Sequence, residues 1–259
     1  MVIDDFIQRA LEAPSSTGLI LDFDGTLSRI VDDPSEAKPL EGVPELLESL
    51  SRSYRTVCIL SGRQAEDIAN KIGVPTLRYI GLYGAEEWVS GELLQPDDAP
   101  KWRGMASRLA RDAESLLVTE SLFGCEVEFK DIAVSIHYRN ALDSSAHDAI
   151  LTWASSAAPR RGFQVGTGRM VIELRPTGVS KAGAFERIVS KHALALAVLA
   201  GDDLTDVEAM QRAEGLMGEN ALRVGVRSAE EPRGLTRFAN HLVGSCEGLV
   251  ELLRRFDVV

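Results

Sequence analysis

The chain has 259 residues, 45% of them hydrophobic, and its 28 basic and 39 acidic side chains give a net charge of −11. An acidic surface repels nucleic-acid backbones, and no apolar run is long enough to span a bilayer. We therefore expect a soluble protein of one large or two ordinary domains that binds neither nucleic acid nor membrane. Three widely spaced cysteines and an acidic amino terminus without a basic start predict reduced thiols and a cytoplasmic location.

Apolar runs and amphipathic segments alternate over residues 1–90. Strands are predicted at 19–23, 56–60 and 79–82, and helices at 44–53 and 64–71. Such alternation indicates a parallel sheet covered by helices. The glycine-rich stretch at 81–84 and the residues after it, 86–92, predict a strand end and a small hairpin.

Residues 95–179 follow a different pattern. A helix followed by two strands is predicted twice: first at 101–120, 126–130 and 133–139, then at 144–157, 163–165 and 170–174. Two such units make a small open sheet with helices on one face, which indicates an inserted domain. The alternating pattern returns at Lys181, with strands at 196–200, 223–226 and 241–243. The sequence thus predicts a core of residues 1–94 and 180–259 and a smaller domain of residues 95–179.

Two carboxylates stand at the end of the first predicted strand. Asp22 and Asp24 follow the apolar run 19–21, and Gly25 lets the chain turn after them. Ligands of open α/β sheets bind beyond the carboxyl ends of the strands, so both acids are expected to face that crevice. An acidic turn without chemistry gives the same pattern, because Asp and Gly favour turns. The motif alone is therefore only moderately specific.

Three further motifs follow in order along the chain. Ser61-Gly62-Arg63 ends the second strand, Lys181 opens a helix, and Gly201–Asp206 ends a later strand in three acids. Together with Asp22 they resemble the four motifs of the haloacid dehalogenase superfamily of phosphotransferases. The resemblance implies an α/β fold, with a Rossmann-like catalytic core built on a parallel sheet and a smaller inserted α+β cap domain. It spans residues 22–206, so a chance match is far less probable than for one motif.

The chemistry of phosphate esters explains why these groups occur together. A phosphate dianion repels a carboxylate, so an aspartate nucleophile needs a divalent cation and a lysine beside it. Mg²⁺ suits an all-oxygen site, for which we expect the carboxylates of Asp22 and Asp202 and the carbonyl of Asp24. The resemblance implies that Asp22 attacks phosphorus to give an aspartyl phosphate. It also implies that Asp24 protonates the leaving sugar oxygen and then activates water.

The same resemblance implies the groups around the phosphate. The expected phosphate-binding residues are Ser61, Lys181, Thr26, Gly62 and Arg63, with Asp203 and Asp206 orienting metal-bound waters and Lys181. Two of these assignments compete with structural roles. Thr205 or Asp206 fits a helix amino-terminal cap equally well, and Arg63 fits a surface cation at a helix start.

The resemblance narrows to trehalose-6-phosphate phosphatases. It is carried by Leu21–Pro34, Ser61–Arg63 and Gly81–Glu86, and in the inserted domain by Glu128–Lys130, Val134–Arg139 and Glu173–Pro176. It implies trehalose 6-phosphate as substrate, and the residues expected to bind it are Glu86, Lys130, His137, Arg139 and Glu173. Solvated strand ends explain Lys130 and Arg139 as well, and a structural histidine explains His137.

Five positions depart from that family. The family usually has proline at Arg29, histidine at Tyr83, glycine at Ala182, and Glu-Asp at Val207-Glu208. None of these changes the expected nucleophile, acid or metal carboxylates, so the reaction type is better supported than the substrate.

Several alternatives stay open. They are a phosphatase for sucrose phosphate or for glucosyl- or mannosyl-3-phosphoglycerate, a phosphomannomutase-like phosphotransferase, and a non-catalytic sugar-phosphate sensor. A bacterial receiver domain is opposed by the chain length and by the late position of the second acidic group. The sequence does not indicate an oligomeric state, and a monomer is compatible with it.

Overall fold

The computed structural model describes residues 3–31, 33–168, 170–229 and 231–257. Asp32, part of the first motif, lies outside the described residues. The chain divides into two compact units, Met1–Leu94 with Ser180–Val259, and Gln95–Val179. No helix in the described ranges has the length and apolar character needed to cross a membrane.

The first unit is built on one large sheet. Among the described residues it has eight strands in the order β12-β11-β10-β1-β2-β3-β4-β5. The parallel strands are β12 (His241–Val243), β11 (Ala221–Val226), β10 (Leu196–Gly201), β1 (Thr17–Leu21), β2 (Thr56–Leu60) and β3 (Arg78–Gly81). The predicted hairpin, β4 (Glu86–Val89) and β5 (Glu92–Leu94), extends this sheet in antiparallel pairing.

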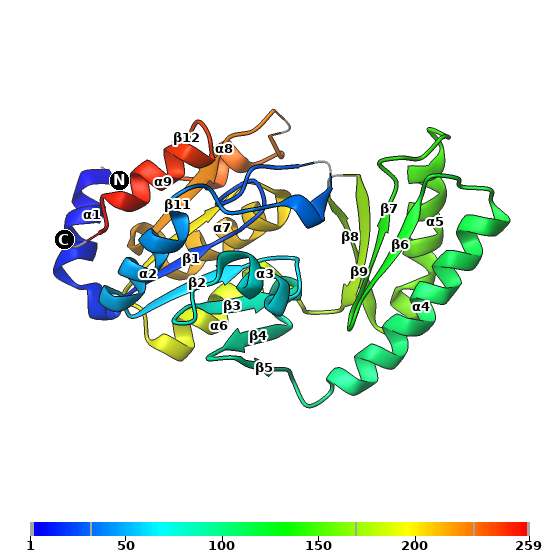
Figure 1. Ribbon diagram of the computed structural model, residues 1–259, viewed down its shortest axis with the longest axis horizontal. Coiled ribbons are helices and arrows are strands. Elements are labelled where there is room, and N and C mark those ends of the chain that lie inside the picture. The colour runs from blue at the N-terminus through cyan, green and yellow to red at the C-terminus, as the bar shows by residue number, and fades with distance from the viewer. Residues whose placement is uncertain (1–2, 32, 169, 230, 258–259) are drawn as a thin grey trace. The chain divides into compact units, whose positions relative to one another are not determined.

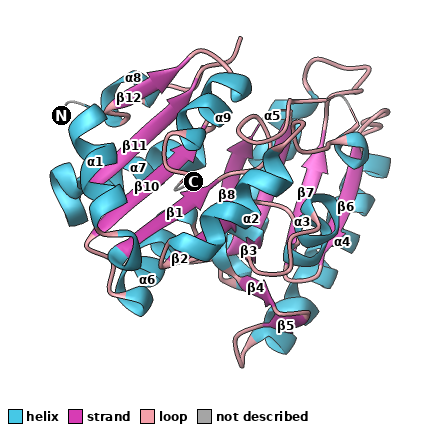
Figure 2. Ribbon diagram, turned by 60° about the vertical axis from the view of Figure 1, so that its left-hand side comes forward, coloured by secondary structure: helices cyan, strands magenta, loops and turns pink. Residues whose placement is uncertain are grey.

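Helices cover both faces of the large sheet (Figures 1 and 2). One apolar cluster joins the sheet to α1 (Ile3–Glu12), α2 (Val43–Ser53), α3 (Ala65–Ile72) and α9 (Cys246–Arg254). The other cluster joins it to α6 (Lys181–His192), α7 (Leu204–Met217) and α8 (Leu235–Phe238). In β1, Leu19 and Leu21 belong to the first cluster and Ile20 to the second. A strand buried on both faces needs apolar residues throughout, which explains the uninterrupted apolar runs in the sequence.

The strand order places a ligand site. β1 lies between β10 and β2. The chain continues from β1 to β2 on one side of it, and after α6 it returns to β10 on the other side. Ligands of such sheets bind at this switch point, outside the carboxyl ends of the strands. Asp22, Ser61 and Asp202 directly follow the strands β1, β2 and β10 and therefore belong to the same edge.

The second unit has an antiparallel sheet covered by helices on one face. Its described strands run in the order β6-β7-β9-β8, with β6 (Glu126–Lys130), β7 (Ala133–His137), β9 (Val171–Pro176) and β8 (Phe163–Gly168). α4 (Ala99–Thr119) and α5 (Ala146–Ala157) pack through a separate apolar cluster that includes Val134, Ile136, Ile172 and Leu174. Because side chains alternate along a strand, the residues between these four face away from the helices.

The predicted fold class is confirmed: a helix-covered parallel sheet is accompanied by a smaller α+β unit. Most predicted elements lie within a few residues of the observed ones. One difference concerns a candidate site residue, since β7 ends at His137 rather than at Arg139. There the chain enters a turn, in which the Ala141 N–H donates to the Tyr138 carbonyl at 3.1 Å. Arg139 therefore lies in a turn and not in the sheet.

Candidate active site

Three strand ends supply buried polar side chains to one edge of the large sheet. Asp22, Ser61 and Asp202 are 4%, 2% and 2% exposed. The sheet also fixes their backbones, because the Asp22 N–H donates to the Ala200 carbonyl and the Ser61 N–H to the Ile80 carbonyl, each at 3.0 Å. Burying a carboxylate is costly unless partners compensate its charge, so the contacts around Asp22 decide what this edge can do.

The turn after Asp22 brings the chain against Asp202. Gly25 has φ of +76°, and its N–H donates to the Ser28 carbonyl at 2.8 Å. A Cβ on Gly25 would lie 2.2 Å from Asp202 Oδ2, so both the conformation and the close approach require glycine here. Thr26 is buried in the same turn, and its hydroxyl lies 3.4 Å from Asp22 Oδ2.

Lys181 is the cation at the centre of this edge. It is the first residue of α6, where the Ser180 side chain caps the helix by accepting from the Gly183 N–H. Lys181 Nζ donates to Asp22 Oδ1 at 2.7 Å and to Asp206 Oδ1 at 2.8 Å, and its side chain is only 2% exposed. The predicted lysine and the predicted nucleophile are thus in direct contact.

Asp203 and Asp206 form the amino-terminal cap of α7. Asp203 is the N-cap residue and accepts from the Asp206 N–H at 2.9 Å, which completes a capping box. Asp206 Oδ2 accepts from the N–H groups of Asp202 and Asp203 at 3.1 and 3.2 Å. The sequence left open whether Asp206 caps the helix or orients Lys181. Asp206 has both contacts, since it belongs to the helix cap and also binds Lys181. The N-cap residue itself is Asp203, a role that the sequence analysis did not assign.

Negative charge exceeds positive charge in this cluster. Oxygens of Asp22, Asp202 and Asp206 lie within 4.8 Å of one another. Burial raises the pKa of Asp22 to about 7; Lys181 opposes this rise, whereas Asp203 and Asp202 add to it. Burial acts to lower the pKa of Lys181, but Asp203, Asp206 and Asp22 outweigh it and hold that pKa well above its ordinary value. One lysine does not balance these carboxylates, so the cluster is suited to a further cation.

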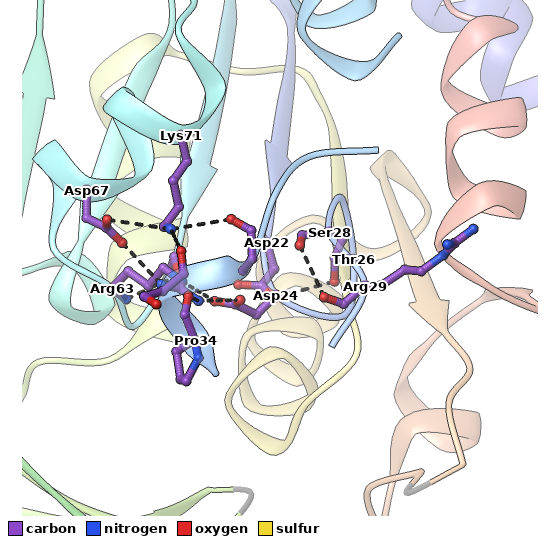
Figure 3. A network of polar contacts seen from close by, with 12 residues as sticks. Asp22, Asp24, Thr26, Ser28, Arg29, Pro34, Arg63, Asp67 and Lys71 are labelled. Carbon is purple, nitrogen blue, oxygen red and sulfur yellow. Dashed lines mark hydrogen bonds and ion pairs between the residues drawn. The ribbon is translucent and has the colours of Figure 1, made fainter. Parts of the chain in front are cut away.

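Arg63 binds Asp24 through both of its oxygens. Nε donates to Asp24 Oδ2 at 2.6 Å and Nη2 to Asp24 Oδ1 at 2.8 Å, with the guanidinium 5.7 Å from the Phe23 ring centre. Figure 3 shows Arg63 reaching toward Asp24, while Arg29 extends away from this group. Arg29 instead pairs with Glu247, at the start of α9. Arg63 is thus an internal partner of the expected acid, not a free surface cation.

A strained turn supports the loop that carries Ser61 and Arg63. Leu82 and Tyr83 have φ of 49° and 62°, values that side-chain-bearing residues adopt at a cost. Their N–H groups donate to the carbonyls of Arg63 and Ser61 at 2.8 and 2.9 Å. A Cβ on Gly62 would lie 2.5 Å from the Tyr83 hydroxyl, so Tyr83 packs closely over this glycine.

The side chain of Glu86, the first residue of β4, reaches the start of α3. Glu86 is 4% exposed, and its Oε1 accepts from the Ala65 N–H at 2.7 Å. A carboxylate at this position satisfies an N–H group of the first turn and interacts favourably with the helix dipole. The structure thus gives this candidate substrate residue a contact within the first unit.

In the second unit, Lys130, His137 and Glu173 lie on one face of the small sheet. Lys130 Nζ lies 3.3 Å from Glu128 Oε2 and 3.9 Å from Glu173 Oε1, and His137 Nε2 lies 2.9 Å from Glu128 Oε2. Ser135, opposite Glu173, donates to it at 3.3 Å. We call Glu128, Lys130, Ser135, His137 and Glu173 the polar sheet face.

Sequence reasoning left out Glu128 and Ser135 of the polar sheet face, and also Arg175, whose place along β9 puts it on the same side of the sheet. Glu128 bridges Lys130 and His137, and Arg175 follows Glu173 by two residues along β9. Burial acts to raise the pKa of Glu128, but His137 and Lys130 lower it to about 2. Glu128 and Arg175 belong to segments that carried the resemblance. The alternation of side chains along a strand could have predicted that they share a face with Lys130 and Glu173.

Comparison with known families fits this geometry. The sequence model of the family described as trehalose-phosphatase matches residues 20–234. The chain belongs to the trehalose-phosphatase family. It is 34% identical over 224 residues to a trehalose-phosphate phosphatase of Mycobacterium marinum, covering 82% of this chain and 54% of the relative. A Mycobacterium leprae trehalose-phosphate phosphatase is 34% identical over 202 residues, covering 74% and 46% of the two chains. The chain thus spans about half the length of these curated relatives.

Solved structures support the fold of the trehalose-phosphatase family. The C-terminal domain of Candida albicans trehalose-6-phosphate phosphatase superposes with a TM-score of 0.77 at 20% identity, covering 100% of this chain and 98% of that one. A haloacid dehalogenase-like hydrolase of Bacteroides thetaiotaomicron gives 0.66 at 15% identity, covering 93% and 99%. The predicted family and the predicted superfamily fold are both confirmed.

The departures from the trehalose-phosphatase pattern differ in their surroundings. Val207 is 4% exposed and belongs to the apolar cluster that joins the sheet to α6, α7 and α8, whereas Glu208 is exposed. Tyr83 covers Gly62 beside Ser61. Of these three side chains, only Tyr83 packs directly on the loop that carries candidate phosphate ligands.

Proposed function

We propose that this protein is a cytoplasmic Mg²⁺-dependent sugar-phosphate phosphatase that hydrolyses trehalose 6-phosphate to trehalose and phosphate. The observation that carries the proposal is the contact between Asp22 and Lys181 at the carboxyl ends of the parallel strands, with Asp202 beside them. A buried carboxylate paired with a lysine next to an acidic cluster is the arrangement that an aspartyl-phosphate mechanism requires.

The donor set fits Mg²⁺. Asp22 and Asp202 each offer a carboxylate oxygen, and the carbonyl of Asp24 completes an all-oxygen set of protein ligands. Asp206 lies close by, but its oxygens already accept from Lys181 and from two backbone N–H groups, so we assign it to orienting Lys181. When bound, Mg²⁺ supplies positive charge that stabilises the phosphoryl oxygens in the transition state.

The side chains of the first unit then divide the reaction into two steps. In the first step an oxygen of Asp22 attacks phosphorus while the bond between phosphorus and the sugar oxygen breaks. The departing sugar oxygen takes a proton from Asp24. In the second step Asp24 takes a proton from water, and the water oxygen attacks phosphorus. The bond between phosphorus and Asp22 breaks, which restores the Asp22 carboxylate. Lys181 compensates charge on Asp22 throughout, because it is already hydrogen-bonded to that side chain.

Phosphate binding in this proposal uses groups near Asp22. We assign Ser61, Gly62 and Thr26 to the phosphoryl oxygens, since Ser61 and Thr26 are buried at the same strand ends. Arg63 was expected to bind the phosphate, but its guanidinium donates hydrogen bonds to both oxygens of Asp24. We therefore assign Arg63 to Asp24 and not to the phosphate.

Sugar recognition is assigned to the polar sheet face of the second unit. A disaccharide presents many hydroxyl groups, and charged side chains are strong hydrogen-bonding partners for them. Glu173, Lys130 and His137 supply acceptors and donors on one face. Arg139 belongs to a turn, and the Glu86 carboxylate accepts from the Ala65 N–H, so both have less support as sugar ligands.

The deciding experiment is phosphate release with Mg²⁺ from trehalose 6-phosphate, sucrose 6-phosphate, glucose 6-phosphate and glucosyl-3-phosphoglycerate. Asp22→Asn protein and an EDTA-treated sample serve as controls. A clear preference for trehalose 6-phosphate that both controls abolish would establish the proposal. Preference for another ester would keep the mechanism and change the substrate, and no release from any ester would favour the mutase or the sensor.

A further inference from the structure

Arg63 is held on several sides, and this arrangement has a consequence for Asp24. Besides its two hydrogen bonds to Asp24, Arg63 donates from Nη2 to the Pro34 carbonyl at 2.8 Å and from Nη1 to Asp67 Oδ2 at 3.1 Å. Its side chain is only 15% exposed. A planar guanidinium with four of its N–H groups engaged has little freedom to rotate, so it holds both oxygens of Asp24 in one orientation.

One side of α3 supplies the rest of this arrangement. Arg63 precedes the helix, and Asp67 and Lys71 follow it at intervals of four residues, which places the three side chains in a row (Figure 3). Asp67 Oδ1 lies 3.9 Å from Lys71 Nζ. Lys71 in turn donates to the carbonyls of Ser35 and Ala37 at 2.8 and 3.3 Å.

The row therefore connects α3 to the chain segment that includes Pro34. Asp67 contacts both cations of the row, and its carboxylate is the anion on the side of Arg63 away from Asp24. Without Asp67, Arg63 loses the hydrogen bond and the ion pair that its Nη1 makes with the Asp67 carboxylate. The orientation of Asp24 would then depend on fewer contacts.

We propose that Asp67 is a positioning residue for proton transfer at Asp24 and acts through Arg63. The proposal rests on the function proposed above, in which Asp24 protonates the leaving oxygen. A proton donor must lie within hydrogen-bonding reach of its acceptor, and small displacements of a catalytic group are costly to rate. Asp67 has no assigned contact with substrate or metal, so its effect should appear in proton transfer and not in binding.

The test compares Asp67→Ala with Glu66→Ala on a series of phosphate esters whose leaving groups span a wide range of pKa. Glu66 is an exposed acid in the same first turn of α3, so both variants lose equal charge and helix-dipole stabilisation. Esters with acidic phenols need little protonation, whereas sugar esters need it fully. For Asp67→Ala we expect kcat to fall about tenfold or more on sugar esters and progressively less on more acidic leaving groups, with KM nearly unchanged.

A conservative variant and a structural readout complete the test. Asp67→Asn keeps an oxygen acceptor for Arg63 and should restore much of the lost rate. In a crystal structure of Asp67→Ala, Arg63 should no longer hold both oxygens of Asp24. Equal losses on all esters, or a profile like that of Glu66→Ala, would overturn the proposal. It would also be overturned if Arg63 kept its two bonds to Asp24, a result that can be read even in a protein that hydrolyses none of the esters.

Discussion

The charged groups of the two units are held in different ways. Around Asp22 and Lys181 the side chains are 5% and 2% exposed, and they come from segments far apart in the sequence. In the polar sheet face, Glu128 and His137 are 51% and 33% exposed and lie on neighbouring strands of one local sheet. The first group is a buried network that depends on every member. The second has a buried part, in which the side chains of Lys130 and Glu173 are 15% and 10% exposed, and an open part at Glu128 and His137 that tolerates rearrangement.

This difference separates reaction from recognition. A buried, fully engaged network holds a nucleophile in one geometry, which the transfer of a phosphoryl group requires. Partly exposed charges can exchange their mutual contacts for sugar hydroxyls at little cost. Changes in the first group should therefore affect every substrate, and changes in the second should affect only substrates that carry the sugar.

The largest effect is expected at the nucleophile. Asp22→Asn keeps the size of the side chain but cannot form the aspartyl phosphate, so kcat should fall at least about 10³-fold on sugar and aryl phosphates alike. Burial raises the pKa of Asp22, so a neutral amide should be tolerated and the unfolding midpoint should not fall. Steady-state kinetics and urea unfolding measure both. Substantial turnover by this variant would rule out the covalent mechanism.

Removal of the buried cation should lower stability as well as activity. Lys181→Met leaves Asp22 and Asp206 without the partner that both now bind, which should lower the free energy of unfolding by about 3–5 kcal/mol. Lys191→Met, on the same helix with a side chain that is 54% exposed, should cost less than about 1 kcal/mol. Chemical denaturation of both variants provides the comparison, and equal losses would show that the network is not cooperative.

A change in the polar sheet face should discriminate between substrates. Glu173→Ala should reduce kcat/KM for trehalose 6-phosphate about tenfold or more, because one sugar contact is lost. Small aryl phosphates should be nearly unaffected. Glu114→Ala, which removes an exposed acid of α4, is the control. If Glu173→Ala impaired both substrates equally, Glu173 would have no role in recognising sugar.

The smallest effect is a pH dependence of the second unit. Contacts with His137 and Lys130 lower the pKa of Glu128 to about 2 against the opposing effect of burial. A lowered folded-state pKa gives stability that is present above the ordinary value of 4.5 and is lost as the pH falls from there toward 2. Since Glu128 is half exposed, solvent screening limits this stability to less than about 1 kcal/mol.

Glu128→Gln should remove that part of the pH dependence. Hydrogen exchange of the amides in β6 and β7, measured in the full chain between pH 5 and 2.5, compares the variant with the unchanged protein. After correction for intrinsic exchange rates, we expect protection to fall less steeply with decreasing pH in the variant. Parallel profiles would show that Glu128 contributes no such stability.

Much of this protein could be predicted from local sequence patterns. Residues 56–60 and 241–243 are strands with the predicted bounds, since their apolar runs and flanking residues suffice to define them. The order of the motifs and the resemblance indicated that Lys181 belongs to the same site as Asp22, as a group that binds the phosphoryl oxygens. Its direct contact with Asp22 comes from the structure. The pairing of Arg63 with Asp24 does as well, because the sequence allowed Arg63 to reach the phosphate, Glu86 or solvent.

Sequence patterns were enough to predict the fold class, the family and the residue types at the strand ends. These follow from hydrophobic periodicity and from the order of chemically distinctive residues, which are properties of the chain alone. The folded chain was needed to show that Asp206 binds Lys181 as well as capping α7, that the Glu86 carboxylate reaches the start of α3, and that Asp67 contacts Arg63. The physical reason is that a polar side chain has many possible partners, and packing decides which of them lies within hydrogen-bonding distance.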